Sequence, residues 1–142
     1  MAQGFNPTHG CEPGGPIFSQ GVVQHEGQVL HVTGQVAWDE ARQVIGPGDA
    51  GAQMAKCVEN IETVLAVVGG RLEDIVSMTI YFVSRDNMPA IRAAREKHLS
   101  FPVGQAPVSI FIQVSGLVDP ALLVELVPIA VIPHARYRPP AL

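Results

Sequence analysis

The sequence predicts one α+β domain in which two helices cover one face of a mixed β-sheet. Its 142 residues provide for a single hydrophobic core and are too few for two comfortable domains. Hydrophobic residues make up 47% of the chain and charged residues 15%, as in an ordinary globular domain. Segments with strand and helix periodicity follow one another in the order β-β-α-β-α-β-β. Helices that cross between strands of one sheet pack on its face, which gives the predicted architecture.

The chain is predicted to begin with an extended arm and a β-hairpin. Residues 1–16 contain three prolines and four glycines, a composition that disfavours a regular element. Residues 17–25 and 28–36 are rich in valine and alternate with polar side chains. Glu26 and Gly27 separate the two segments, as in a hairpin turn. These segments are therefore expected to be the first two strands.

A first helix is predicted after a loop at residues 38–48. Asp49 stands where an N-cap residue is expected, and Gly69-Gly70 ends the helical pattern. Apolar residues recur between them at spacings of three and four, which is typical of the buried face of a surface helix. They are Met54, Cys57, Val58, Ile61, Leu65 and Val68. Cys57 is expected to pack as a small hydrophobe, with no disulfide to Cys11.

The second half of the chain is predicted to hold three strands and a second helix. The strands are residues 75–83, 108–115 and 122–132, which are rich in β-branched and aromatic side chains. The helix is residues 85–99, where an early proline is tolerated in the first turn. A tail at residues 133–142 is expected to be loose.

The strand patterns also predict which faces are buried. The residues expected to face the helices are Val76, Met78, Ile80 and Phe82 of one strand and Val108, Ile110, Ile112 and Val114 of the next. The last strand is apolar in both alternations. Because two helices cannot cover two faces, the second face is expected to be buried by another subunit. A closed homo-oligomer is thus favoured over a monomer.

Glu125 is the most informative single residue for chemistry. It shares a strand face with Val127, Ile129 and Val131 rather than with other charges. Burial raises the pKa of a carboxyl group, so Glu125 could act as a general acid or base near neutral pH. A structural glutamate, bonded to the backbone or paired with an arginine across an interface, explains the same pattern equally well.

Several other classes of function are disfavoured. The net charge of −4 argues against nucleic-acid binding, and no apolar run approaches the length of a membrane span. The histidines show no metal-ligand spacing, and no phosphate-binding or dinucleotide-binding glycine motif is present. The sequence therefore predicts no metal, no cofactor and no membrane partner. Without the pattern of a secretory signal at the N-terminus, a cytoplasmic location is expected.

Short stretches along nearly the whole chain resemble the RidA/YjgF family. They are Gly15-Pro16-Ile17-Phe18-Ser19-Gln20, Val32-Thr33-Gly34-Gln35, Val58-Glu59-Asn60-Ile61 with Gly69-Gly70, Asp74-Ile75-Val76, and Val124-Glu125-Leu126 through Ile129-Ala130-Val131. Their order and spacing carry the resemblance. It implies a chorismate-mutase-like fold, a homotrimer with its sheets turned inward, and three small-molecule clefts between neighbouring subunits.

The best-studied members of this family hydrolyse reactive 2-imino acids to 2-keto acids and ammonia. An arginine holds the substrate carboxylate, and a glutamate on the last strand assists the attacking water. By this resemblance Glu125 matches the glutamate, Phe18 the aromatic residue of the cleft, and Gly34 the backbone position near the ligand. Ser109 stands where the arginine belongs. The same strand places Phe111 among the candidate substrate-binding residues.

With Ser109 in place of the arginine, the charge-assisted pair with the substrate carboxylate is lost, which costs about 1.5 to 3 kcal/mol of binding. Two functions therefore remain open. Either the chain is an enzyme of shifted specificity, acting on imines, enamines or related acids through Glu125, or it is a non-catalytic metabolite-binding or regulatory trimer. Arg92 occupies the helix position of a pocket-lining asparagine and could anchor an acid, although it could equally face solvent. Arg95 is expected to lay its stem over the core.

Overall fold

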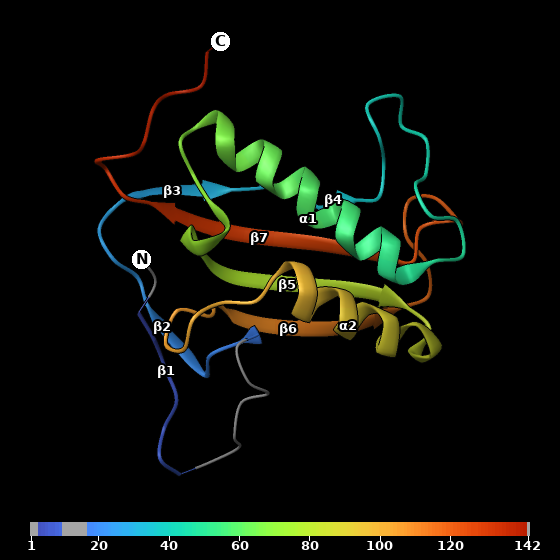
Figure 1. The fold of residues 1–142 in the computed structure, drawn as a ribbon, viewed down its shortest axis with the longest axis horizontal. Coiled ribbons are helices and arrows are strands. Elements are labelled where there is room, and N and C mark those ends of the chain that lie inside the picture. Colours follow the sequence, from blue (N-terminus) through green and yellow to red (C-terminus); the bar gives the residue numbers. More distant parts are fainter. Residues whose placement is uncertain (1–2, 10–16, 142) are drawn as a thin grey trace.

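The computed structural model describes residues 3–9 and 17–141. Its strands are β1 (Gln3–Phe5), β2 (Gly21–Val23), β3 (Gln28–His31), β4 (Gln35–Val36), β5 (Ile75–Val83), β6 (Val108–Val114) and β7 (Val124–Ile132) (Figure 1). Its α-helices are α1 (Ala50–Val67) and α2 (Met88–His98), and the short 3-10 helices η2 (Leu72–Asp74) and η3 (Arg85–Asn87) precede β5 and α2. No helix of the described residues is both long and apolar enough to cross a membrane.

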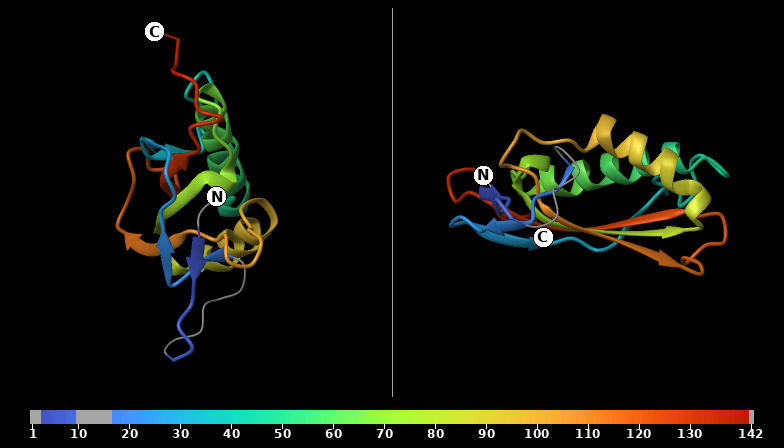
Figure 2. Two further views of the ribbon diagram at one scale, coloured as in Figure 1. Left: turned by 90° about the vertical axis from the view of Figure 1, so that its left-hand side faces the viewer. Right: turned by 90° about the horizontal axis from the view of Figure 1, so that it is seen from below.

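The principal sheet is mixed and carries both α-helices on one face. Its order is β3-β7-β5-β6, with β4 also paired to β7. β5 and β6 run parallel, whereas β7 is antiparallel to β3, β4 and β5. Seen from below in Figure 2, α1 and α2 lie side by side on the same side of the sheet. The predicted α+β fold with two helices on one sheet face is confirmed.

The predicted N-terminal hairpin is wrong. β2 pairs with β1, which lies in the expected extended arm, and these two strands form a separate sheet. β3 pairs instead with β7, and Gln28 lies opposite Ile132. Gly27 allows this approach, because a Cβ at that position would lie 2.5 Å from the Ile132 carbonyl oxygen. The glycine therefore serves a close backbone contact across the sheet. The remainder of the arm, at residues 10–16, lies outside the described residues.

Helix α1 follows the prediction closely. The Asp49 carboxylate accepts a hydrogen bond of 3.0 Å from the backbone N–H of Ala52, which caps the helix. Cys57 is fully buried on the face of α1 that packs on the sheet, and its thiol sulfur lies 3.9 Å from the Val124 carbonyl oxygen. Burial, with a smaller contribution from the Glu125 charge, raises the pKa of Cys57 to about 12. The thiol is thus the small hydrophobe expected from its place on the apolar stripe.

The predicted faces of β5 and β6 need two corrections. A bulge between Ile75 and Ser77 moves Val76 to the face opposite the helices, where it packs with Val131. On β6 the whole assignment is inverted. Phe111 packs toward the helices, whereas Ile110 and Ile112, on the opposite face, are 57% and 38% exposed. The alternation of β6 is clear, but the pattern alone does not say whether the helices or another surface meet its apolar side.

Parallel pairing with β5 decides which face of β6 meets the helices. Met78, Ile80 and Phe82 of β5 face the core, and their partners on β6 are Ser109, Phe111 and Gln113. Phe111 meets Phe82 edge to face, with ring centroids 5.9 Å apart. This register brings Ser109 and Phe111 beneath α2, where they enter the site described below.

The C-terminal tail is bound to the rest of the domain as far as Arg138, whereas the sequence predicted a loose tail. Arg136 donates to the Gly69 carbonyl oxygen and to the fully buried Asp74 carboxylate, both at 2.9 Å from its Nη1. Arg138 donates to the Ala66 carbonyl oxygen at the end of α1. A Cβ at Gly69 would lie 2.1 Å from the Arg136 carbonyl oxygen, so the tail needs a glycine there. The tail therefore seals the end of α1.

We predict that Arg136→Ala destabilises the fold by about 2 kcal/mol, because it leaves a buried carboxylate without its cation. Chemical denaturation at neutral pH measures the free energy of unfolding. Arg138→Ala is the matched control, since Arg138 is exposed and bonds one carbonyl. It is expected to change stability by less than about 0.5 kcal/mol. Equal losses in the two variants would show that the Asp74 contact does not hold the tail.

Candidate functional site

Glu125 and Gly34 form one half of the candidate site. Glu125 lies on β7, opposite Val36 of β4 and Tyr81 of β5. A Cβ at Gly34 would lie 2.8 Å from Glu125 Oε1, so the backbone of residue 34 approaches the carboxylate closely. Both residues line a cavity of about 450 Å³. The sequence placed these two residues in one site, and the structure brings them into contact.

The backbone beside Glu125 is held in place from α1. The Asn60 side chain donates to the carbonyl oxygens of Val36 and Trp38, each at 3.0 Å. Arg42 lies over the Trp38 ring, with its guanidinium carbon 5.8 Å from the ring centroid. Trp38, Arg42 and Asn60 all line the same cavity as Glu125. These contacts explain the asparagine of the Val58–Ile61 motif as a residue that fixes the segment after Gly34.

Four other predicted residues form a second half-site. Phe18, Arg92, Ser109 and Phe111 line a cavity of about 400 Å³ between α2, β6 and the segment at residues 17–18. The two cavities share no lining residue. Glu125 lies on β7 between Val124 and Leu126, which face the core, whereas Ser109 lies beneath α2 on β6, with β5 between the two strands. Neither Ser109 nor Phe18 lines the cavity that contains Glu125.

Arg95 is the site residue that the sequence analysis missed. Its side chain is 1% exposed, and its Nη2 donates to the Ile17 carbonyl oxygen at 2.7 Å and to Ser109 Oγ at 2.9 Å. The guanidinium carbon lies 5.4 Å from the centre of the Phe111 ring. Burial lowers the pKa of Arg95 to about 10. An arginine on the apolar stripe of a helix was the available signal, but it was assigned to core packing.

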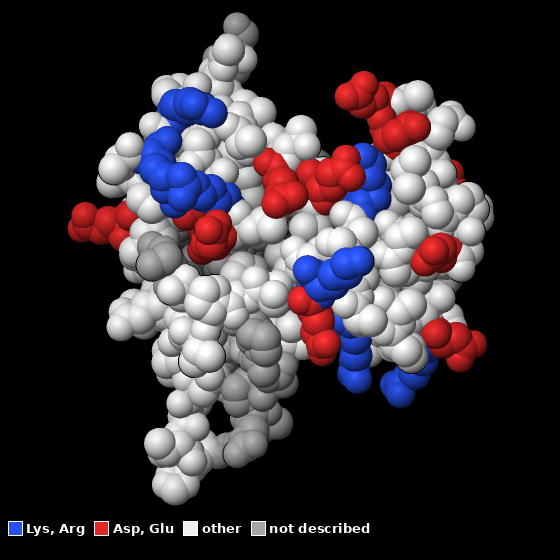
Figure 3. All heavy atoms as spheres, in the orientation of Figure 1, with Lys and Arg blue, Asp and Glu red and all other residues white. Residues whose placement is uncertain are grey.

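The groove that continues from this half-site is basic. A neighbouring cavity of about 480 Å³ between α2 and β6 shares Arg92 and Phe111 and is also lined by Arg85. Three of the chain's nine Lys and Arg residues thus line the groove, and Glu96 is the single acid among its described lining residues. Figure 3 shows Lys and Arg atoms over and below the position of α2. On a chain of net charge −4, this groove is a region of local positive charge.

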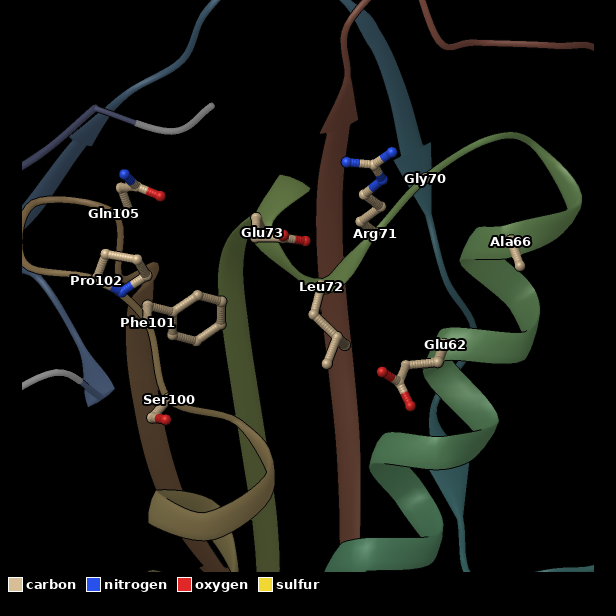
Figure 4. Close-up of a pocket in the computed structure, with 10 residues that line it drawn as sticks. All are labelled: Glu62, Ala66, Gly70, Arg71, Leu72, Glu73, Ser100, Phe101, Pro102 and Gln105. Carbon is tan, nitrogen blue, oxygen red and sulfur yellow. The ribbon is translucent and has the colours of Figure 1, made fainter.

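The largest described cavity lies elsewhere, with a volume of about 640 Å³. Figure 4 shows Phe101 on one side of it and Glu62 of α1 on the other, with Leu72 between them. None of the predicted site residues lines this cavity. Among residues 3–9 and 17–141, no three His, Cys, Asp or Glu side chains gather where they could hold a metal ion.

Comparison with known proteins agrees with the fold and the motifs. A family model described as Endoribonuclease L-PSP matches residues 14–132. The chain is 32% identical to the Rid-family protein YyfB of Yersinia pestis, with a TM-score of 0.79 over 92% of this chain and 98% of that one. RidA from a Psychrobacter species is 25% identical, with a TM-score of 0.66 over 81% and 88% of the two chains.

A protein of Thermotoga maritima described as a putative endoribonuclease shares the fold, with 22% identity and a TM-score of 0.65 over 92% of each chain. The family match covers far more than half of the sequence and includes the motifs that carry the resemblance. The resemblance drawn from the sequence is therefore confirmed. The chain belongs to the Rid/YjgF family, which is also described as the Endoribonuclease L-PSP family.

Proposed function

We propose that this chain forms a homotrimer with small-molecule clefts between its protomers. The observation that carries the proposal is the division of the candidate site between two cavities that share no lining residue. Association of protomers edge to edge brings the Glu125 half of one chain to the Ser109 half of the next. Each cleft then contains a carboxylate on one wall and a basic, aromatic pocket on the other.

The uncovered face of the sheet supports the same assembly. Ile110, Ile112 and Val29 are 57%, 38% and 38% exposed, which leaves apolar area in contact with water. A small apolar cluster around Val76 and Val131 lies on this face as well. Sheets turned toward the centre of a trimer bury these side chains, and closed symmetry leaves no further apolar face to associate.

In this cleft we assign Glu125 as the general base for hydrolysis of an imine, an enamine or a related small acid. The carboxylate takes a proton from water as the water oxygen adds to the carbon of the protonated imine, which gives a neutral carbinolamine. Protonated Glu125 then returns this proton to the amine nitrogen, the C–N bond breaks with release of ammonia, and the hydroxyl group loses its proton to become a carbonyl group. Phe18 and Phe111 line the apolar wall, and Ser109 and Arg92 contact the polar end of the substrate. Neither a metal nor a cofactor is needed for these steps.

A non-catalytic metabolite-binding or regulatory trimer is the second candidate. The observation that favours it is that Ser109, and not an arginine, occupies this position of β6. Its hydroxyl group already accepts a hydrogen bond from Arg95. The same cleft can then bind a metabolite without turning it over. Net charge and the small size of the basic groove give little support to RNA as the ligand.

We predict that the protein releases ammonia from freshly generated 2-imino acids and that Glu125→Gln lowers kcat about 100-fold, because the general base is lost. Ammonia is measured in a coupled assay. Glu59→Gln is the matched control, since Glu59 is exposed on α1 and pairs only with Lys56. An inactive wild type that gains activity as Ser109→Arg would instead support the binding trimer.

Ile110→Glu is predicted to dissociate the trimer, because it places charges on the apolar face where protomers meet. Sedimentation velocity should give about three times the 15.1 kDa chain mass for the wild type and one chain mass for the variant. Val103→Glu is the control, because Val103 is 95% exposed in the loop after α2 and away from the sheet face. A wild type that sediments as a monomer would contradict the proposed assembly.

Gly34→Ala is predicted to displace the Glu125 carboxylate, because the new methyl group would lie 2.8 Å from Oε1. The carbon-13 resonance of the Glu125 carboxyl carbon should shift, and hydrolysis should slow about tenfold as the base leaves its position. Gly51→Ala on α1 is the control, since its nearest neighbour would lie at 3.5 Å. An unchanged Glu125 resonance in Gly34→Ala would show that the close approach does not position the carboxylate.

A further inference from the structure

Arg95 is a buried cation to which the described residues give no carboxylate partner. Buried arginines are ordinarily paired with an acid, because the free energy of removing a charge from water is large. Here the partners of the guanidinium are a carbonyl oxygen, a hydroxyl and an aromatic ring. These dipoles solvate the cation but do not neutralise it. The positive charge of Arg95 is therefore not balanced by a neighbouring negative charge, and an anion bound beside it would be stabilised.

The hydrogen-bonding capacity of this pair is also incomplete. A guanidinium has five N–H donors, and the two recorded bonds of Arg95 both use Nη2. Nε is buried and has no partner among the described residues. Ser109 Oγ accepts from Arg95, so its own proton remains available for donation. Arg95 and Ser109 together can thus supply two donors to two oxygens of one group.

The cavity in front of them suits a small organic anion. Its volume of about 400 Å³ is within the usual range for metabolite sites. Phe18 and Phe111 provide apolar contact for a carbon chain, and Arg92 adds a second positive charge. A dipolar wall around a buried cation is an arrangement that selects a carboxylate over a neutral group of equal size.

We propose that this pocket binds the carboxylate of a small organic acid, with Arg95 as its anchor and the Ser109 hydroxyl as a second donor. The Arg95 guanidinium on α2 thereby holds the carboxylate, a role that the family resemblance gives to an arginine at position 109 and for which Arg92 was the other candidate. The inference rests on the proposed function in placing the acid end of the ligand in the same cleft, opposite Glu125. Because Nε is buried, the side chains around it must move for this donor to reach the acid.

The test uses the full-length wild-type protein and pyruvate as the probe, with methyl pyruvate as its uncharged counterpart. Nuclear magnetic resonance follows the Nε–H signal of Arg95, which burial protects from exchange. Pyruvate is expected to shift this signal in a saturable manner, and methyl pyruvate to leave it unchanged. This measurement needs no substitution of Arg95, so a variant that fails to fold cannot obscure the result.

Ser109→Asp provides the second arm, because it places a carboxylate of the chain itself beside Arg95. It is expected to weaken pyruvate binding at least about tenfold and to raise the melting temperature, as the buried cation gains a partner. Lys97→Gln is the matched control, because it removes one positive charge from an exposed position on α2. Its affinity for pyruvate should stay within about twofold of the wild type.

The outcomes separate this inference from the proposed reaction. An Arg95 signal that shifts with pyruvate in a protein without hydrolytic activity supports the anchor and rejects the reaction. Hydrolysis of 2-imino acids that is unaffected by Ser109→Asp supports the reaction and overturns the anchor. An Arg95 signal that stays fixed at saturating pyruvate, or equal affinities for pyruvate and methyl pyruvate, also overturns the anchor.

Discussion

The register of β5 with its two neighbours is the constraint on which the rest of the structure depends. Antiparallel pairing with β7 and parallel pairing with β6 align these three strands and decide which face of each one meets the helices. The bulge after Ile75 shifts the alternation by one residue, so Ile75 and Met78 both reach the helix side. Through this register Ser109 is carried under α2, and Glu125 is carried to the opposite face.

Burial of Arg95 shows how one tertiary contact can change the chemistry of a family position. Ser109 alone is a short, neutral side chain on β6. Beside Arg95 it becomes part of a charged, partly satisfied pair at the wall of a cavity. The low polarity around the pair strengthens its interaction with an anion, because little water screens the charge. A cation supplied by the helix can therefore serve a strand whose residue at this position is neutral.

The division of the site between two cavities connects the proposed assembly with the proposed function. In one protomer the Glu125 cavity and the Ser109 cavity share no lining residue. In the trimer that we propose, a ligand contacts the Glu125 cavity of one chain and the Ser109 cavity of the next. Burial of the apolar sheet face in this trimer would then also set the geometry of each cleft. Gly34 and Asn60 line the Glu125 cavity, and Arg95 and Phe111 line the Ser109 cavity.

The sequence by itself determined the helix α1 with its Asp49 cap and the strands β5, β6 and β7. These features depend on local periodicity, capping chemistry and motif spacing, which a linear pattern contains. Only the tertiary structure decided the partner of β3, the buried face of β6 and the role of Arg95. Strand pairing joins segments about 100 residues apart, as in Gln28 with Ile132, and the apolar alternation of a strand does not show which surface will cover it. The role of a buried charged residue such as Arg95 depends on which groups the fold places around it, and these groups are distant in the sequence.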